Sequence, residues 1–213
     1  MSRRLVGAAS AAAVLMALGV QAAPASAASG GGCRLQGTAG FSPGLSSTAQ
    51  NFSYSFSGAL SSCQSSDATA PTSGSVEAGK TVTRQVTNSV TGATDSVTYQ
   101  EPVPTGNGSC ATSTTSGTAI ARWADGTTTV IGYTTSGAAA AVDLSGNVVP
   151  SVTLNATNAQ SGDPTTLTIA TTRYAGYGSD GLLTFQPPDP TACNGAGVPT
   201  AAIDGFVGLG SSS

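Results

Sequence analysis

The sequence predicts an all-β fold: a single antiparallel two-sheet sandwich of about ten strands, immunoglobulin-like or jelly-roll-like. Composition is one reason, because 30 of the 213 residues are Thr, 29 are Ser and only 8% are charged. Few Leu, Glu and Lys residues argue against helices, whereas Thr and Val favour strands. Spacing is the other reason, because short segments of alternating apolar and polar residues are separated by turns rich in Gly and Pro. A closed barrel is the main alternative.

The N-terminal segment, residues 1–27, is typical of a secretory signal peptide. Arg3 and Arg4 precede an apolar stretch over residues 5–20, and Ala25-Ser26-Ala27 follows as a cleavage site. The apolar stretch is shorter than the roughly 20 residues that a membrane-spanning helix needs. We therefore expect residues 28–213 to form one secreted, extracellular, all-β domain that contains disulfides and has no membrane span.

The first half of this domain predicts two hairpins. Residues 35–41 and 52–60 form the first, with Phe52, Tyr54 and Phe56 on one face of the second strand. Residues 82–90 and 97–99 form the second, which is the most polar and is expected at an edge or protruding.

The strongest hairpin pattern is residues 120–131, centred on Asp125-Gly126. Asp-Gly suits a two-residue type I′ turn, which sets Trp123 opposite Thr128 and Ile120 opposite Ile131. We expect Trp123 to be a core aromatic residue.

The remaining segments complete the strand assignment, with no helix after the signal peptide. Long loops are expected at residues 64–73 and 187–199, and frayed ends at residues 29–32 and 210–213. The later strands are expected at residues 141–144, 148–156, 166–172, 182–186 and 201–209.

Four cysteines in an exported chain predict two disulfides, for which three pairings exist. We prefer Cys33 with Cys63, because folding the first hairpin about residue 48 brings these two opposite each other. Cys110 then pairs with Cys193 and closes a long loop.

The composition excludes several function classes. No His is present, which removes Ser-His-Asp and Cys-His catalysis and His-ligated zinc. After signal cleavage five scattered basic residues face ten acidic ones, a net charge of −5, so nucleic acid is not an expected partner. No catalytic residue, cofactor or metal ligand is predicted. A pair of Asp or Glu residues is the remaining acid-base machinery, and Asp204 is notable because it falls inside a strand.

Exposed aromatic rings are the candidate ligand contacts. Tyr174 and Tyr177 lie in a small-residue segment after residue 172, and rings of this kind stack on sugar faces. Tyr177 is the more exposed of the two in this prediction.

Several motifs of the chain resemble a group of uncharacterised secreted proteins from actinobacteria. The motifs are Cys33-x-x-x-Gly37, Phe41-Ser42-Pro43-Gly44-Leu45, Phe56-Ser57-Gly58 with Cys63, Trp123-Ala124-Asp125-Gly126, and Ala192-Cys193. They consist of turn, strand and disulfide residues, so the resemblance implies an exported β domain and no particular activity.

The sequence therefore predicts a secreted, non-enzymatic protein that acts by surface interaction with cell-wall or environmental glycan or with another extracellular protein. The alternatives are a small polysaccharide hydrolase with an Asp/Glu pair and a structural component of the cell envelope.

Overall fold

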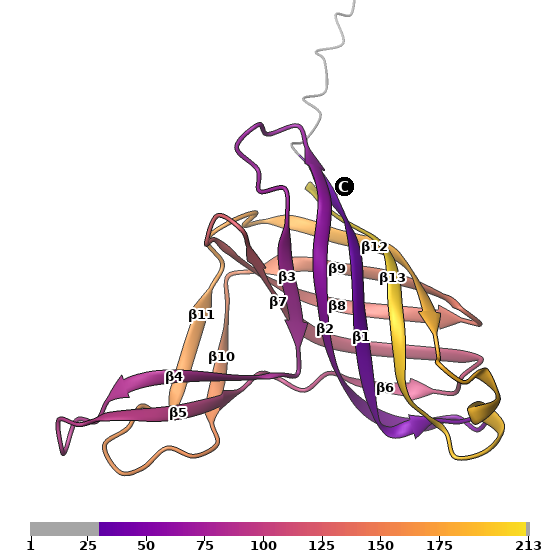
Figure 1. Cartoon of the computed structure of the whole chain (residues 1–213). Helices are drawn as coiled ribbons and strands as arrows, with labels where there is room; N and C mark the ends of the chain where they lie inside the picture. The colour runs from indigo at the N-terminus through magenta and orange to yellow at the C-terminus, as the bar shows by residue number, and fades with distance from the viewer. Residues whose placement is uncertain (1–29, 212–213) are drawn as a thin grey trace, which may run out of the picture.

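The computed structural model describes residues 30–211, and this part of the chain is built from strands (Figure 1). The predicted signal peptide, residues 1–27, lies outside the described residues. The strands in chain order are β1 (Gly31–Leu45), β2 (Gln50–Ser65), β3 (Gly74–Ala78), β4 (Thr81–Thr87), β5 (Thr94–Gln100), β6 (Thr105–Gly108), β7 (Thr112–Trp123), β8 (Thr128–Ala138), β9 (Ala141–Val149), β10 (Ser151–Ala156), β11 (Thr166–Ala170), β12 (Tyr177–Gln186) and β13 (Val198–Ser211).

The larger sheet of this region closes on itself. Its strand order is β1-β13-β12-β9-β8-β7-β3-β2-β6, and β1 also pairs with β2. The short strands β3 and β6 share one position, because both pair with β2 on one side and with β7 on the other. The result is an antiparallel barrel of eight strand positions with an up-and-down strand order. The all-β prediction is confirmed, but the predicted two-sheet sandwich is wrong.

A second, four-stranded sheet of order β11-β10-β5-β4 extends from one side of the barrel (Figure 1). It consists of two hairpins that leave the barrel wall after β3 and after β9. Its apolar face, with Val97, Tyr99 and Leu154, packs on Ile120 of β7. The polar hairpin of β4 and β5 protrudes and places β4 at a sheet edge, as the sequence predicts.

Several predicted boundaries are wrong for identifiable reasons. The strand expected at residues 148–156 is divided at Pro150, where the chain passes from β9 of the barrel to β10 of the second sheet. Gly31, Gly32 and Gly210 are paired strand residues, not frayed ends. The loop expected at residues 187–199 contains the short 3₁₀ helix η1 (Pro190–Asn194).

The β7–β8 hairpin differs from the prediction by one residue. Arg122 pairs with Thr128 and Ile120 pairs with Val130. Gly126 N donates to the Trp123 carbonyl oxygen (3.0 Å) and Trp123 N donates to Thr127 O (2.9 Å), with Gly126 at φ +83°. This is a type I turn followed by a glycine bulge, not a type I′ turn, and the extra residue shifts the register.

Both disulfides have the pairing that the sequence predicts. Cys33–Cys63 joins β1 to β2 where Arg34 pairs with Ser61, and Cys110–Cys193 joins the turn before β7 to η1. The two bridges indicate an oxidising, extracellular environment. Within residues 30–211, no helix has the length and apolar character needed to cross a membrane.

Candidate functional site

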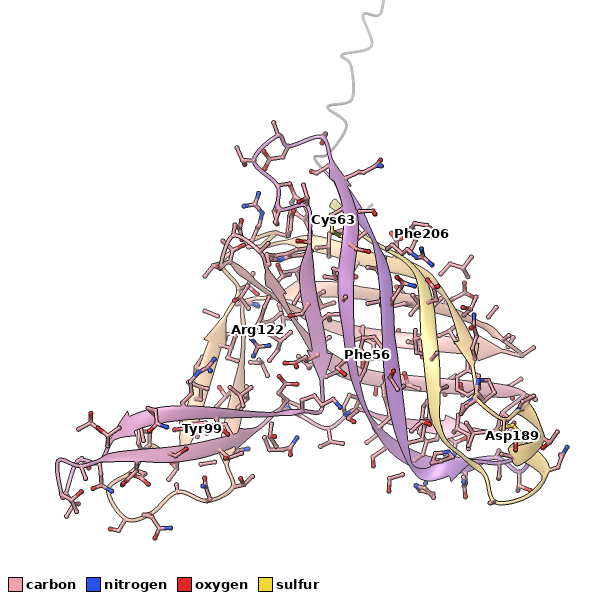
Figure 2. All side chains as sticks on the ribbon, viewed as in Figure 1. Phe56, Cys63, Tyr99, Arg122, Asp189 and Phe206 are labelled. Carbon is pink, nitrogen blue, oxygen red and sulfur yellow. A yellow bond between two sulfur atoms is a disulfide. The ribbon has the colours of Figure 1, made fainter. Side chains whose placement is uncertain are left out.

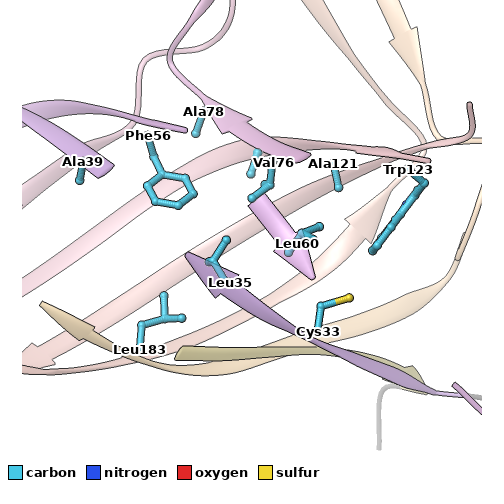
Figure 3. Close-up of a cluster of buried hydrophobic side chains, with 11 residues drawn as sticks. Cys33, Leu35, Ala39, Phe56, Leu60, Val76, Ala78, Ala121, Trp123 and Leu183 are labelled. Atoms are coloured by element: carbon cyan, nitrogen blue, oxygen red, sulfur yellow. The ribbon is translucent and has the colours of Figure 1, made fainter. Parts of the chain in front are cut away.

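The inner face of the barrel lines a partly open cavity of about 170 Å³. Its apolar lining comes from strands all around the barrel, including Leu35, Val76 and Leu183, whose side chains converge on the interior (Figure 3). Alternation explains this arrangement, because every second residue of a barrel strand points inward. The inward positions of β7 include the small residues Ala119 and Ala121, which leave space where larger side chains would fill the barrel.

Four hydroxyl groups form a connected chain on the cavity wall, which we call the hydroxyl chain. Tyr133 Oη lies 2.7 Å from Tyr54 Oη, Tyr54 Oη lies 3.0 Å from Thr115 Oγ1, and Thr115 Oγ1 lies 2.7 Å from Thr135 Oγ1. All four side chains are half-buried and line the cavity. Burial raises the pKa of both tyrosines, so their hydroxyls stay protonated near neutral pH.

Next to the hydroxyl chain, the cavity is lined by a cluster of aromatic rings, which we call the floor of the barrel. The Phe41 ring contacts the rings of Phe52 and Phe185, with centroid distances of 5.8 and 5.9 Å. Cys110–Cys193 lies against this cluster and ties η1 to the turn before β7. The floor therefore joins segments that are distant in the sequence.

Tyr174, which precedes β12, also lines the cavity. The Tyr174 ring contacts the Trp123 ring edge to face, with centroids 5.5 Å apart. Arg173 anchors this segment by ion pairs to Asp125 (3.0 Å) and Asp67 (3.4 Å) in two neighbouring loops. Arg173 thus ties the segment that carries Tyr174 to the two loops that carry Asp125 and Asp67.

The structure brings the two predicted aromatic contacts together but changes their surroundings. Tyr177 is half-buried at the start of β12, not exposed in a loop, and its ring lies 5.6 Å from that of Tyr174. The Arg173 guanidinium lies over the Tyr174 ring at 5.2 Å. Trp123 is a core residue, as predicted, and Trp123 Nε1 donates to Thr129 Oγ1 (2.8 Å).

Sequence reasoning did not find the hydroxyl chain. Tyr54 was expected on the apolar face of its strand, which is correct, but its partners come from β7 and β8. One local signal was present, because Thr115 and Thr135 are directly opposite in the β7–β8 hairpin. The pairing of Thr115 with Thr135 follows only from the observed register of the β7–β8 hairpin, which differs by one residue from the predicted register.

The acidic residues lie outside the cavity lining. Asp204, which the sequence singled out, is on the outer face and pairs with Arg34 (2.8 Å). Glu77 and Glu101 are brought together by Arg122, at 3.2 and 3.9 Å from its Nη1 and Nη2 atoms. Figure 2 shows Arg122 on the side of the barrel that faces the second sheet. Burial of Glu101 raises the pKa of its carboxyl group, and the nearby Glu77 charge adds to this effect.

Among the described residues, no group of three or more His, Cys, Asp or Glu residues is arranged to hold a metal ion. No family model, curated protein or solved structure matches this chain. The resemblance to secreted actinobacterial proteins therefore stays a prediction.

Proposed function

We propose that this protein is a secreted binding protein that holds one small, mainly apolar molecule inside its barrel. The cavity of about 170 Å³ carries this proposal. Barrels of eight strands have interiors just wide enough for side chains or for one small ligand. In this barrel, the small side chains of Ala119 and Ala121 leave part of the interior unfilled, which provides space for a ligand.

The cavity volume sets the size of the ligand. An apolar protein cavity of about 150 Å³ stays dry and binds benzene. A compound with a single six-membered ring and a small substituent therefore suits this barrel. Burial of its apolar surface supplies the driving force, at about 25 cal/mol for each Å² removed from water.

The experiment that tests this proposal is isothermal titration calorimetry of the oxidised protein, residues 28–213, with toluene and methylenecyclohexane. We expect both to bind, and Ala119→Leu to weaken binding about tenfold or more because the added side chain occupies the cavity. Ala119 lines the cavity and is 8% exposed.

Ala59→Leu is the matched control, because Ala59 is an exposed residue of β2. Its added atoms extend into solvent, so ligand affinity stays at the wild-type value. Failure of both compounds to bind, or equal weakening by the two variants, would contradict the proposal. The predicted surface binding of glycan or protein is a separate prediction.

A further inference from the structure

We propose that the ligand carries one uncharged hydrogen-bond acceptor, such as a ketone oxygen, which receives a proton from the hydroxyl chain. This inference rests on the proposed function, because it names the chemical class of molecule that the same cavity selects. Three features carry it: the number of protons in the hydroxyl chain, the position of the chain on the cavity wall, and the uncharged lining.

The hydroxyl chain has one proton more than it can use. Tyr133, Tyr54, Thr115 and Thr135 carry four hydroxyl protons, and the three hydrogen bonds between them consume three. Within the described part of the chain, these three are the hydrogen bonds that the four hydroxyl groups make. One O–H group is therefore left to donate elsewhere.

The spare proton faces the ligand space. A hydroxyl that accepts from both neighbours keeps its own proton, so the unused O–H is on Tyr54 or Thr115 in those arrangements, and both of these residues line the cavity. When each hydroxyl instead donates to the next, the unused O–H is on Thr135 or on Tyr133, depending on the direction of the chain. Both residues lie on β8, two positions apart, and both line the cavity. A donor that faces an apolar ligand and meets no acceptor is costly, so a ligand that accepts this proton gains affinity over one that cannot.

The lining also decides the charge of the ligand. The described residues that line the cavity include no Asp, Glu, Lys or Arg. A carboxylate or an ammonium group would lose its hydration there without meeting an opposite charge. A neutral acceptor loses much less hydration free energy on entering the cavity and gains the hydrogen bond from the hydroxyl chain.

A matched pair of ligands isolates the acceptor. Cyclohexanone and methylenecyclohexane share a six-membered ring and differ in a C=O against a C=CH₂ group. We expect calorimetry to show cyclohexanone binding about 3- to 10-fold more tightly, the range for one neutral hydrogen bond. Cyclohexanecarboxylate is expected not to bind.

Variants then assign this preference to the hydroxyl chain. Shortening the chain is not enough, because any chain of hydroxyls keeps one spare proton. The variant Tyr54→Phe/Thr115→Val/Tyr133→Phe/Thr135→Val replaces each of the four hydroxyl-bearing side chains with an apolar side chain of similar shape. We expect it to bind methylenecyclohexane at least as tightly as the wild type and to lose the preference for cyclohexanone.

Thr114→Val/Thr134→Val is the control, because these residues are exposed neighbours on the outer face of β7 and β8. It should keep the ketone preference. The wild-type comparison tests the inference even if the fourfold variant does not fold. Equal wild-type affinity for the two ligands would overturn the inference while leaving the proposed function intact, whereas binding of neither would overturn both.

Discussion

At the scale of single residues, Glu101 is a carboxylate that the fold accommodates poorly. It is 1% exposed, and Oε2 accepts a hydrogen bond from Lys80 N (3.1 Å). Its Oε1 has no hydrogen-bond partner among the described residues, and the nearest cation, Arg122 Nη2, is 3.9 Å away. Arg122 is shared with the half-buried carboxylate of Glu77. Desolvation is therefore incompletely compensated and raises the Glu101 pKa.

This raised pKa predicts a pH dependence of stability. Between the pKa of unfolded Glu, about 4.3, and the higher folded value, the folded state holds more protons than the unfolded state. The free energy of unfolding therefore falls as pH rises through that window, by up to about 1.4 kcal/mol per pH unit. Glu101→Gln stays neutral and can still accept from Lys80 N, so it should gain stability relative to wild type between pH 4 and pH 7. Urea unfolding across this pH range measures the difference.

Asp143→Asn is the control for Glu101→Gln, because Asp143 is an exposed carboxylate on β9. It removes one exposed carboxylate and therefore measures what the loss of a surface charge alone contributes over the same pH range. A constant difference between Glu101→Gln and wild type would contradict the argument from burial.

The candidate site shows which features of single residues can be predicted from the sequence and which cannot. The inward direction of Tyr54 follows from alternation with Phe52 and Phe56, and Trp123 is correctly assigned to the core. What alternation cannot supply is the partner of an inward side chain. The Tyr54–Tyr133 contact joins residues 79 positions apart, on strands that do not pair with each other.

At the scale of elements, the β7–β8 hairpin shows why a correct turn does not guarantee a correct register. Asp125-Gly126 marks the turn, as predicted, but Asp-Gly is compatible with two turn geometries. In the observed one, Asp125 Oδ1 accepts from Thr127 N (2.9 Å), which stabilises the bulged form. The one-residue shift decides that Ile131 faces the cavity while Ile120 faces the second sheet.

Gly126 is the residue on which this geometry depends. Its φ of +83° is unfavourable for any residue with a Cβ, although a Cβ would meet nothing within 4 Å. We therefore expect Gly126→Ala to cost about 1–2 kcal/mol through backbone strain alone. Gly126→Asn should cost less, because Asn adopts this conformation more readily. Urea unfolding followed by the fluorescence of Trp123, the only tryptophan, measures both.

The control for the turn is Gly40→Ala, a strand glycine at which a Cβ would lie 3.8 Å from its nearest neighbour. It should change stability little. If Gly126→Ala were as stable as wild type, the bulged turn would not require this glycine.

At the scale of the whole molecule, the sequence predicts the strands better than their assembly. The alternation of apolar and polar residues indicates that one face of each strand is buried. A sandwich and a barrel both bury one face of each strand, so the pattern does not distinguish them. Closure depends on β1 pairing with β13, for example Leu35 with Gly205, which no local pattern encodes. A further signal is obscured by the second sheet, which packs on Ile120 on the outer face of the barrel, where the neighbouring Val130 is buried as well. The alternation of β7 is lost there because both of its faces are covered.

The two disulfides should contribute unequally to the stability of this assembly. Cys33–Cys63 spans 30 residues between strands that already pair, whereas Cys110–Cys193 spans 83 residues across the barrel floor. Loop-closure entropy predicts a stabilisation of about 3.6 kcal/mol for the first and about 4.5 kcal/mol for the second. Cys110→Ala/Cys193→Ala should therefore lower the free energy of unfolding more than Cys33→Ala/Cys63→Ala in urea titrations under matched conditions. The reverse order would mean that packing around Cys33, which is 6% exposed in the barrel core, outweighs the entropy of the larger loop.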